Sequence, residues 1–138
     1  MIAKQFVKDG SLWRPVTADD VAGTLLVDPV GSLVAITVGT SASTLAALMT
    51  TAGASIDAST EFLELKIRDD QAEANVVKLA WSGTVTGTLY DAVMTLDTSR
   101  SDPASLLGRI AKAGADAYSL IATASTVVLV RQYKRASS

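Results

Sequence analysis

The chain has 138 residues, a formal net charge of −2, and neither histidine nor cysteine. The absence of these two residue types rules out a Ser-His-Asp triad, a thiol nucleophile, a disulfide and a Cys/His zinc site. Twelve Lys and Arg residues against fourteen Asp and Glu residues give no strongly basic surface, which disfavours nucleic-acid binding. We therefore expect a protein that binds a partner, without an enzymatic activity, a cofactor or a metal.

The length suggests a core domain with a short leader. We expect an extended N-terminal arm or edge segment at residues 1–31 and a single folded domain at 32–135. Within the arm, residues 4–7 and 11–16 have weak strand character. The arm contains Trp13, which either covers the edge of its own core or anchors the chain in a neighbouring subunit, as Trp often does at interfaces.

The residues around the end of the arm predict a turn, and the uncharged run that follows does not predict a membrane-spanning helix. Asp28-Pro29 followed by Gly31 is typical of a turn. Residues 29–56 carry no charge, but glycines and many Ser and Thr residues interrupt this run, so we expect no membrane-spanning helix. The first ten residues lack the apolar stretch of a secretory signal, so we expect a soluble protein.

The remainder of the chain is dominated by strand patterns. Residues 62–68 alternate apolar and charged side chains, as a half-buried strand does, with Leu63, Leu65 and Ile67 on the inner side. The other predicted strands are 33–38, 76–81, 90–96, 119–123 and 126–133. The expected fold is mainly β, a β-sandwich or jelly-roll-like antiparallel domain with one or two short helices.

Two segments predict those helices. The first is about ten residues long, with Ser41 or Ser43 as its cap and Gly53 at its end, and its apolar face consists of Leu45, Leu48, Met49 and Ala52. The second would begin at Asp102-Pro103 and end at Gly114, with Lys112 in its last turn and Leu106, Leu107 and Ile110 near one face.

Several residue patterns resemble functional sites, but each favours a structural role. Three acidic pairs could in principle support hydrolysis: Asp19 and Asp20, Asp69 and Asp70, and Asp91 with Asp97. Adjacent acids in a chain more often flank turns. The acidic turn at residues 69–73 lacks the spacing of an EF-hand calcium loop. Gly83 and Gly87 lie in a loop with no following helix, which favours a hairpin over a phosphate site. Trp81 and Tyr90 flank this loop, and they are rim or core aromatics or else a stacking surface for a sugar.

One family resemblance follows from the order of small and apolar segments. These segments are VAITVGTSASTLAAL from Val34, AG at 52–53, IDAST from Ile56, FLEL from Phe62, VKLAWSG from Val77, AYSLIATA from Ala117, and the strand at 126–133. Their succession over residues 33–133 resembles small virion structural proteins of tailed bacteriophages, especially capsid decoration (cement) proteins. The resemblance implies a homo-oligomer that is made in the host cytoplasm and lies on the capsid surface of the virion, bound between major capsid subunits and stabilising the expanded head.

Under this hypothesis, exposed strand edges and an anchor replace a pocket. The candidate partner-binding residues are Phe6, Val7, Leu12, Trp13 and Tyr133, together with a basic tail of Arg131, Lys134 and Arg135. A dimer or trimer is expected because oligomers usually close symmetrically. Two alternatives remain open: a tail, baseplate or fibre-attachment protein of a phage, and a non-viral module that binds a carbohydrate or a protein.

Overall fold

The computed structural model divides the chain into two compact units, Pro29–Lys134 and Met1–Asp28 with Arg135–Ser138. The structure describes residues 6–9, 12–15, 27–97, 99, 106–111, 114 and 117–136. In the strands at 6–9, 12–15 and 106–111 it describes the backbone alone.

The N-terminal unit contains a β-hairpin. Strand β1 (Phe6–Asp9) pairs antiparallel with β2 (Leu12–Pro15). The register sets Phe6 opposite Pro15 and Lys8 opposite Trp13. The weak strand character of this part of the sequence is confirmed, and Pro15 lies at the end of a two-stranded sheet, where its missing N–H is tolerated.

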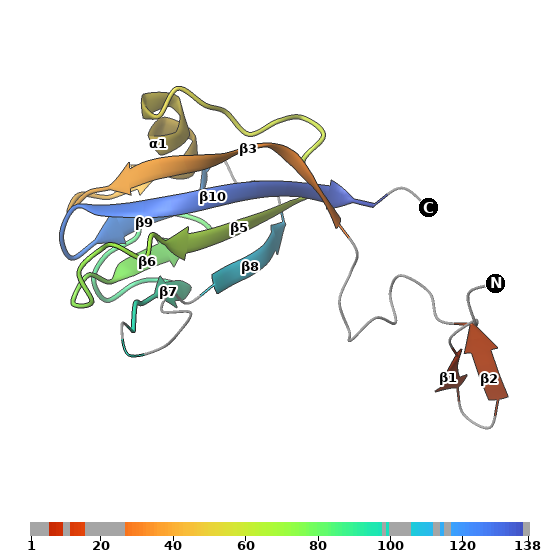
Figure 1. The fold of residues 1–138 in the computed structure, drawn as a ribbon. Helices are drawn as coiled ribbons and strands as arrows, with labels where there is room; N and C mark the ends of the chain where they lie inside the picture. The colour runs from red at the N-terminus through yellow and green to blue at the C-terminus, as the bar shows by residue number, and fades with distance from the viewer. Residues whose placement is uncertain are drawn as a thin grey trace. The chain divides into compact units, whose positions relative to one another are not determined.

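The larger unit is mainly β, with strands that pair antiparallel (Figure 1). Among the described residues, one sheet has the strand order β3-β10-β5-β8 and the other has the order β4-β9-β6-β7. The first sheet consists of β3 (Val27–Val38), β10 (Thr126–Arg135), β5 (Phe62–Ile67) and β8 (Leu106–Ala111). The second consists of β4 (Ser43–Thr44), β9 (Ser119–Ala122), β6 (Val77–Ala80) and β7 (Ala92–Met94).

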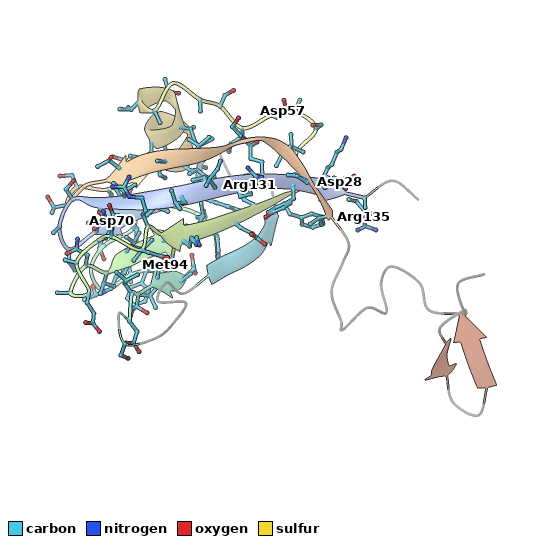
Figure 2. All side chains as sticks on the ribbon, in the orientation of Figure 1. Asp28, Asp57, Asp70, Met94, Arg131 and Arg135 are labelled. Atoms are coloured by element: carbon cyan, nitrogen blue, oxygen red, sulfur yellow. The ribbon has the colours of Figure 1, made fainter. Side chains whose placement is uncertain are left out.

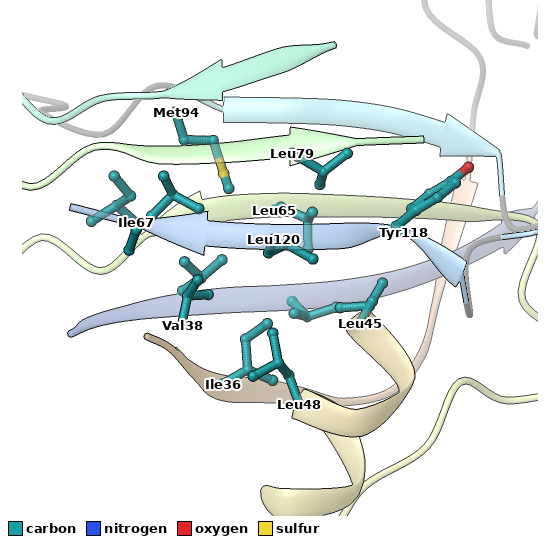
Figure 3. Close-up of a cluster of buried hydrophobic side chains, with 14 of the residues drawn as sticks. Ile36, Val38, Leu45, Leu48, Leu65, Ile67, Leu79, Met94, Tyr118 and Leu120 are labelled. Atoms are coloured by element: carbon teal, nitrogen blue, oxygen red, sulfur yellow. The ribbon is translucent and has the colours of Figure 1, made fainter. Parts of the chain in front are cut away.

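Both sheets contribute to a single hydrophobic core. Figure 3 shows Leu65 and Ile67 of β5 in the same cluster as Leu79 of β6, Leu120 of β9 and Met94 of β7. All five are buried. Because burial of one such side chain contributes about 1.5–3 kcal/mol, the cluster is the main source of stability. The alternation predicted for β5 is confirmed, since Leu63, Leu65 and Ile67 are buried while the residues between them are half-buried.

The single helix of the described residues, α1 (Leu45–Thr51), is seven residues long. It buries Leu45, Leu48 and Met49 as predicted, and Gly53 follows its end with a φ of +75°. Two details of the prediction are wrong. The N-cap is Thr44, whose Oγ1 accepts from Ala47 N at 3.2 Å, and Ala52 is exposed.

The late start of α1 has a tertiary cause. Ser43 and Thr44 form β4 and pair with β9, and Leu45 N donates to Tyr118 O at 2.7 Å. The backbone before Leu45 is therefore engaged in a sheet, so Ser41 and Ser43 cannot cap the helix.

The helix predicted at residues 102–114 is wrong over its middle, which is strand β8. Residues 106–111 pair antiparallel with the edge of β5, with Leu63 opposite Ile110 and Leu65 opposite Leu107. A ladder of inter-strand hydrogen bonds outweighs a helical pattern that Gly108 already weakens by about 1 kcal/mol. The predicted cap at Asp102-Pro103 and Lys112 lie outside the described residues.

The turn predicted at Asp28-Pro29 is also wrong, because these residues lie within β3. A proline is tolerated there because β3 is an edge strand with β10 as its neighbour in the sheet. Gly31 does adopt a left-handed backbone, with φ of +67°. The glycine therefore introduces a local irregularity without reversing the chain.

Candidate functional site

One candidate surface of the larger unit is the edge strand β3, which has β10 as its neighbour in the sheet. This strand has twelve residues, and its exposed positions include Pro29, Gly31, Ser32, Leu33, Ala35 and Thr37. Leu33 is 51% exposed. No residue from Pro29 to Val38 is charged. Natural edge strands usually carry a charge or a proline against pairing. Beyond Pro29 and the left-handed Gly31, residues 32–38 carry neither, so this part of β3 is suited to accept a further strand.

Tyr133, a predicted partner-binding residue, lies on β10 and is half-buried. Its Oη donates to Glu64 Oε2 on the neighbouring strand at 3.1 Å. Burial, and then the charge of Glu64, raise the pKa of Tyr133 above its ordinary value. The phenol is thus held on its own sheet, with only part of the ring available to a partner.

The other predicted anchors belong to the N-terminal unit. Phe6 and Val7 lie on β1, and Leu12 and Trp13 lie on β2. The hairpin brings these four positions within two adjacent strands. Their side chains lie outside what the structure describes, so their role in binding stays a prediction.

A second surface is formed by the loop between β6 and β7, residues 81–91. Trp81 N donates to Asp91 Oδ2 at 2.8 Å, and Asp91 N donates to Leu79 O at 2.8 Å, which closes the base of the loop. In its middle, Val85 is buried and its amide donates to Ser119 Oγ at 3.1 Å. The loop is therefore fixed at its base and at its centre.

This loop borders an open hollow of about 320 Å³ lined by Ala80, Ser82, Gly83, Thr84, Leu89, Tyr90 and Asp91. Four large apolar side chains are exposed on or beside the loop: Trp81, Leu89, Tyr90 and Val93. Leu89 is 69% exposed. Lys78 Nζ lies 4.5 Å from the centre of the Tyr90 ring and donates to Gly87 O at 2.5 Å. The result is an open site with an aromatic wall and a polar base.

Sequence reasoning identified only part of this surface. The sequence places Trp81 and Tyr90 at the two ends of the loop, and the structure adds an edge-type contact between the rings of Trp81 and Tyr118, whose centroids lie 5.1 Å apart. Trp81 is thus a rim residue that also packs on the core. The exposure of Leu89 and Val93 was missed, although a leucine next to a tyrosine in a glycine-marked loop was a usable signal.

The described carboxylates are spread over different parts of the larger unit or accept hydrogen bonds from neighbouring residues. Figure 2 shows Asp57 and Asp70 in different parts of the larger unit. Asp70 Oδ1 accepts from Arg68 Nε at 2.6 Å and from Gln71 Nε2 at 3.0 Å, and these hydrogen bonds lower the pKa of Asp70. Asp97 Oδ1 accepts from the amide and the hydroxyl of Ser99. These acids stabilise turns, and Asp19 and Asp20 lie outside the described residues.

Across the described ranges, no group of three or more acidic residues is placed to hold a metal ion. No helix found in the same residues is long and apolar enough to cross a bilayer. Gly83 adopts a φ of +78° within the 81–91 loop, and strand β7 follows this loop, as a hairpin requires.

Comparison with known proteins gives no match: no family model, no curated protein and no solved structure is similar to this chain. The chain's own surfaces therefore supply the functional observations, namely the uncharged residues 29–38 at the edge of β3 and the hollow of the 81–91 loop.

Proposed function

We propose that this chain is a virion structural protein of a tailed bacteriophage, namely a capsid decoration protein that binds between major capsid subunits and stabilises the expanded head. The observation that carries the proposal is the edge strand β3, whose residues 29–38 carry no charge and include several exposed positions. The resemblance of residues 33–133 to cement proteins supports the same assignment.

We further infer that the larger unit is a β-sandwich of the jelly-roll type. Antiparallel pairing in both sheets and a core shared between them support a sandwich. Such a domain fits a scaffold role, because it presents strand edges and loops on a rigid core without needing a catalytic cleft.

Attachment would follow from strand addition and repetition. A neighbouring strand added to β3 gains backbone hydrogen bonds as well as side-chain contacts such as those of Leu33. Binding only the expanded shell stabilises that shell by mass action. Copies arranged as a dimer or trimer raise the effective concentration at each next site, so a modest interface becomes a strong one.

The first test asks where the protein is found. Virions of the phage that encodes this chain are purified, separated into heads and tails, and searched for it by mass spectrometry. Recovery with the heads supports the proposal, whereas recovery with the tails supports the tail or baseplate alternative. Absence from both fractions overturns the assignment to the virion.

The second test measures binding of the full chain to purified heads before and after expansion. Leu33→Lys places a charge on the β3 edge and is expected to weaken binding to expanded heads at least tenfold. Leu89→Lys is the matched control, since Leu89 is also an exposed leucine but lies on the 81–91 loop. Equal binding of the Leu33 variant and the unchanged chain would contradict the role of β3.

The N-terminal hairpin is tested in the same assay. Trp13→Ala is expected to weaken attachment by about 30-fold, the effect of losing an interface anchor worth about 2 kcal/mol. Its melting temperature should change little. A large drop in melting temperature would instead identify Trp13 as a core residue.

A further inference from the structure

The hollow of the 81–91 loop is not needed for strand addition at β3, and its chemistry differs. We propose that this hollow binds a neutral saccharide, with Tyr90 as the apolar wall and Asp91 as the principal hydrogen-bond acceptor. The proposal depends on the 81–91 loop alone and does not require that the protein binds a capsid.

Tyr90 supplies a positioned aromatic surface. Its side chain is 45% exposed, and the ammonium of Lys78 lies 4.5 Å from the ring centre. The hydrogen bond from Lys78 Nζ to Gly87 O holds this ammonium in place, and the cation–π contact in turn limits movement of the ring. The electron-rich face of an aromatic ring attracts polarised C–H groups, and a pyranose presents such groups on one side of its ring.

Asp91 supplies a fixed acceptor. Its Oδ2 accepts from Trp81 N, and its own amide donates to Leu79 O, so the side chain and the backbone are both anchored. Within the described residues, Asp91 Oδ1 accepts no hydrogen bond, and the hydroxyls of Ser82 and Thr84 have no partner. A carboxylate oxygen and two hydroxyls thus line the hollow with unused hydrogen-bonding capacity, which matches the rim of hydroxyls around a sugar.

These unused groups favour a sugar over a protein surface. A protein docked on exposed Leu89 and Tyr90 would exclude water from Asp91, Ser82 and Thr84, and each polar group left without a partner would cost about 1–3 kcal/mol. A hydroxyl-rich ligand satisfies them instead. Among the lining residues Asp91 alone is charged, so nothing there favours an anionic ligand. The volume of about 320 Å³ is at the lower end of the range for small-molecule sites, about 300–1,000 Å³.

The test uses the full chain in two steps. It is first applied to an array of neutral and acidic glycans. It is then titrated with methyl glycosides of glucose, galactose, mannose and N-acetylglucosamine while backbone amide shifts are followed by NMR. The expected result is binding to neutral glycans and a saturable shift of amides in residues 81–91. No array binding and no shift with any glycoside would overturn the proposal, as would shifts confined to another part of the chain.

Three variants assign the roles. Tyr90→Ala is expected to weaken glycoside binding at least tenfold. Asp91→Asn keeps an oxygen for Trp81 N but removes the charged acceptor, and is expected to weaken it severalfold. Val93→Ala is the matched control, because Val93 is 46% exposed beside the site but does not line it, and its affinity should be unchanged. If Tyr90→Ala abolishes binding to capsids while no glycan binds, the surface is a protein-docking site and the proposal is wrong.

Discussion

Gln132 accepts a hydrogen bond through its Oε1 from the hydroxyl of Thr60 at 2.7 Å, across 72 positions of the chain. Both side chains are buried. The same Oε1 accepts from Asp57 N at 2.8 Å, and Gln132 Nε2 donates to Ser55 O at 3.2 Å. One inward-facing amide on β10 therefore holds the segment between α1 and β5.

Gln132→Met is expected to destabilise the larger unit by about 2–4 kcal/mol, because it leaves the Thr60 hydroxyl and two backbone groups without partners. The free energy of unfolding from urea titrations measures this loss. Thr60→Val should cost about 1–2 kcal/mol alone and much less in the Gln132→Met background. Additive losses in the double variant would show that the two side chains do not interact.

Ser119→Ala is expected to release the centre of the 81–91 loop. Val85 N would lose its acceptor in a buried environment, at a cost of about 1–2 kcal/mol, and its amide should exchange faster with deuterium. Thr123→Val is the comparison, because Thr123 Oγ1 accepts from Val76 N at an exposed site, where water can replace it. Equal costs for the two variants would contradict the difference in burial.

Gly53→Ala is expected to lower stability by about 1–2 kcal/mol, since alanine is strained at a φ of +75°. No heavy atom lies within 4 Å of the added Cβ, so the cost comes from the backbone and not from a clash. Gly39→Ala is the matched control, because Gly39 has equal space and no positive φ. The free energy of unfolding of the Gly39→Ala variant should stay the same or rise by about 0.4–1 kcal/mol.

Tyr133 makes alkaline stability depend on pH. Burial and Glu64 raise its pKa in the folded chain above that of an unfolded tyrosine, so folding favours the neutral phenol. This contribution is fully present below the unfolded pKa of about 10 and is lost as the pH rises through the higher folded value.

The variant Glu64→Gln removes the charge next to the phenol, so the pKa of Tyr133 should fall. An NMR titration of the Tyr133 ring checks this shift, and the Tyr133→Phe variant identifies its signals. An unchanged or higher pKa in the Glu64→Gln chain would show that the carboxylate does not act on this hydroxyl.

The sequence predicted elements whose pattern is local and periodic. The alternation of residues 62–67 is confirmed, because a period of two can bury one side of a strand only in this way. The apolar face formed by Leu45, Leu48 and Met49 is confirmed for the same reason at a helical period.

Pairing between strands distant in the sequence determined the structure of three segments whose local residue pattern predicts something else. Residues 106–111 carry a helical spacing but form β8, because β5 offers them an unpaired edge. Asp28 and Pro29 have turn chemistry but lie in β3, because an edge strand tolerates proline. The helix starts at Leu45 because the two residues before it pair with β9.

The candidate site shows the same division. Composition alone excluded histidine and cysteine chemistry, and Trp81 and Tyr90 marked the loop between β6 and β7. Only the tertiary structure shows how that loop borders a hollow. Asp91 accepts from Trp81 N at the base of the loop, and Ser119 Oγ accepts from Val85 N at its centre. Residue types limit which chemistry is available, but the contacts that fix a loop join segments distant in the chain, and no local pattern encodes them.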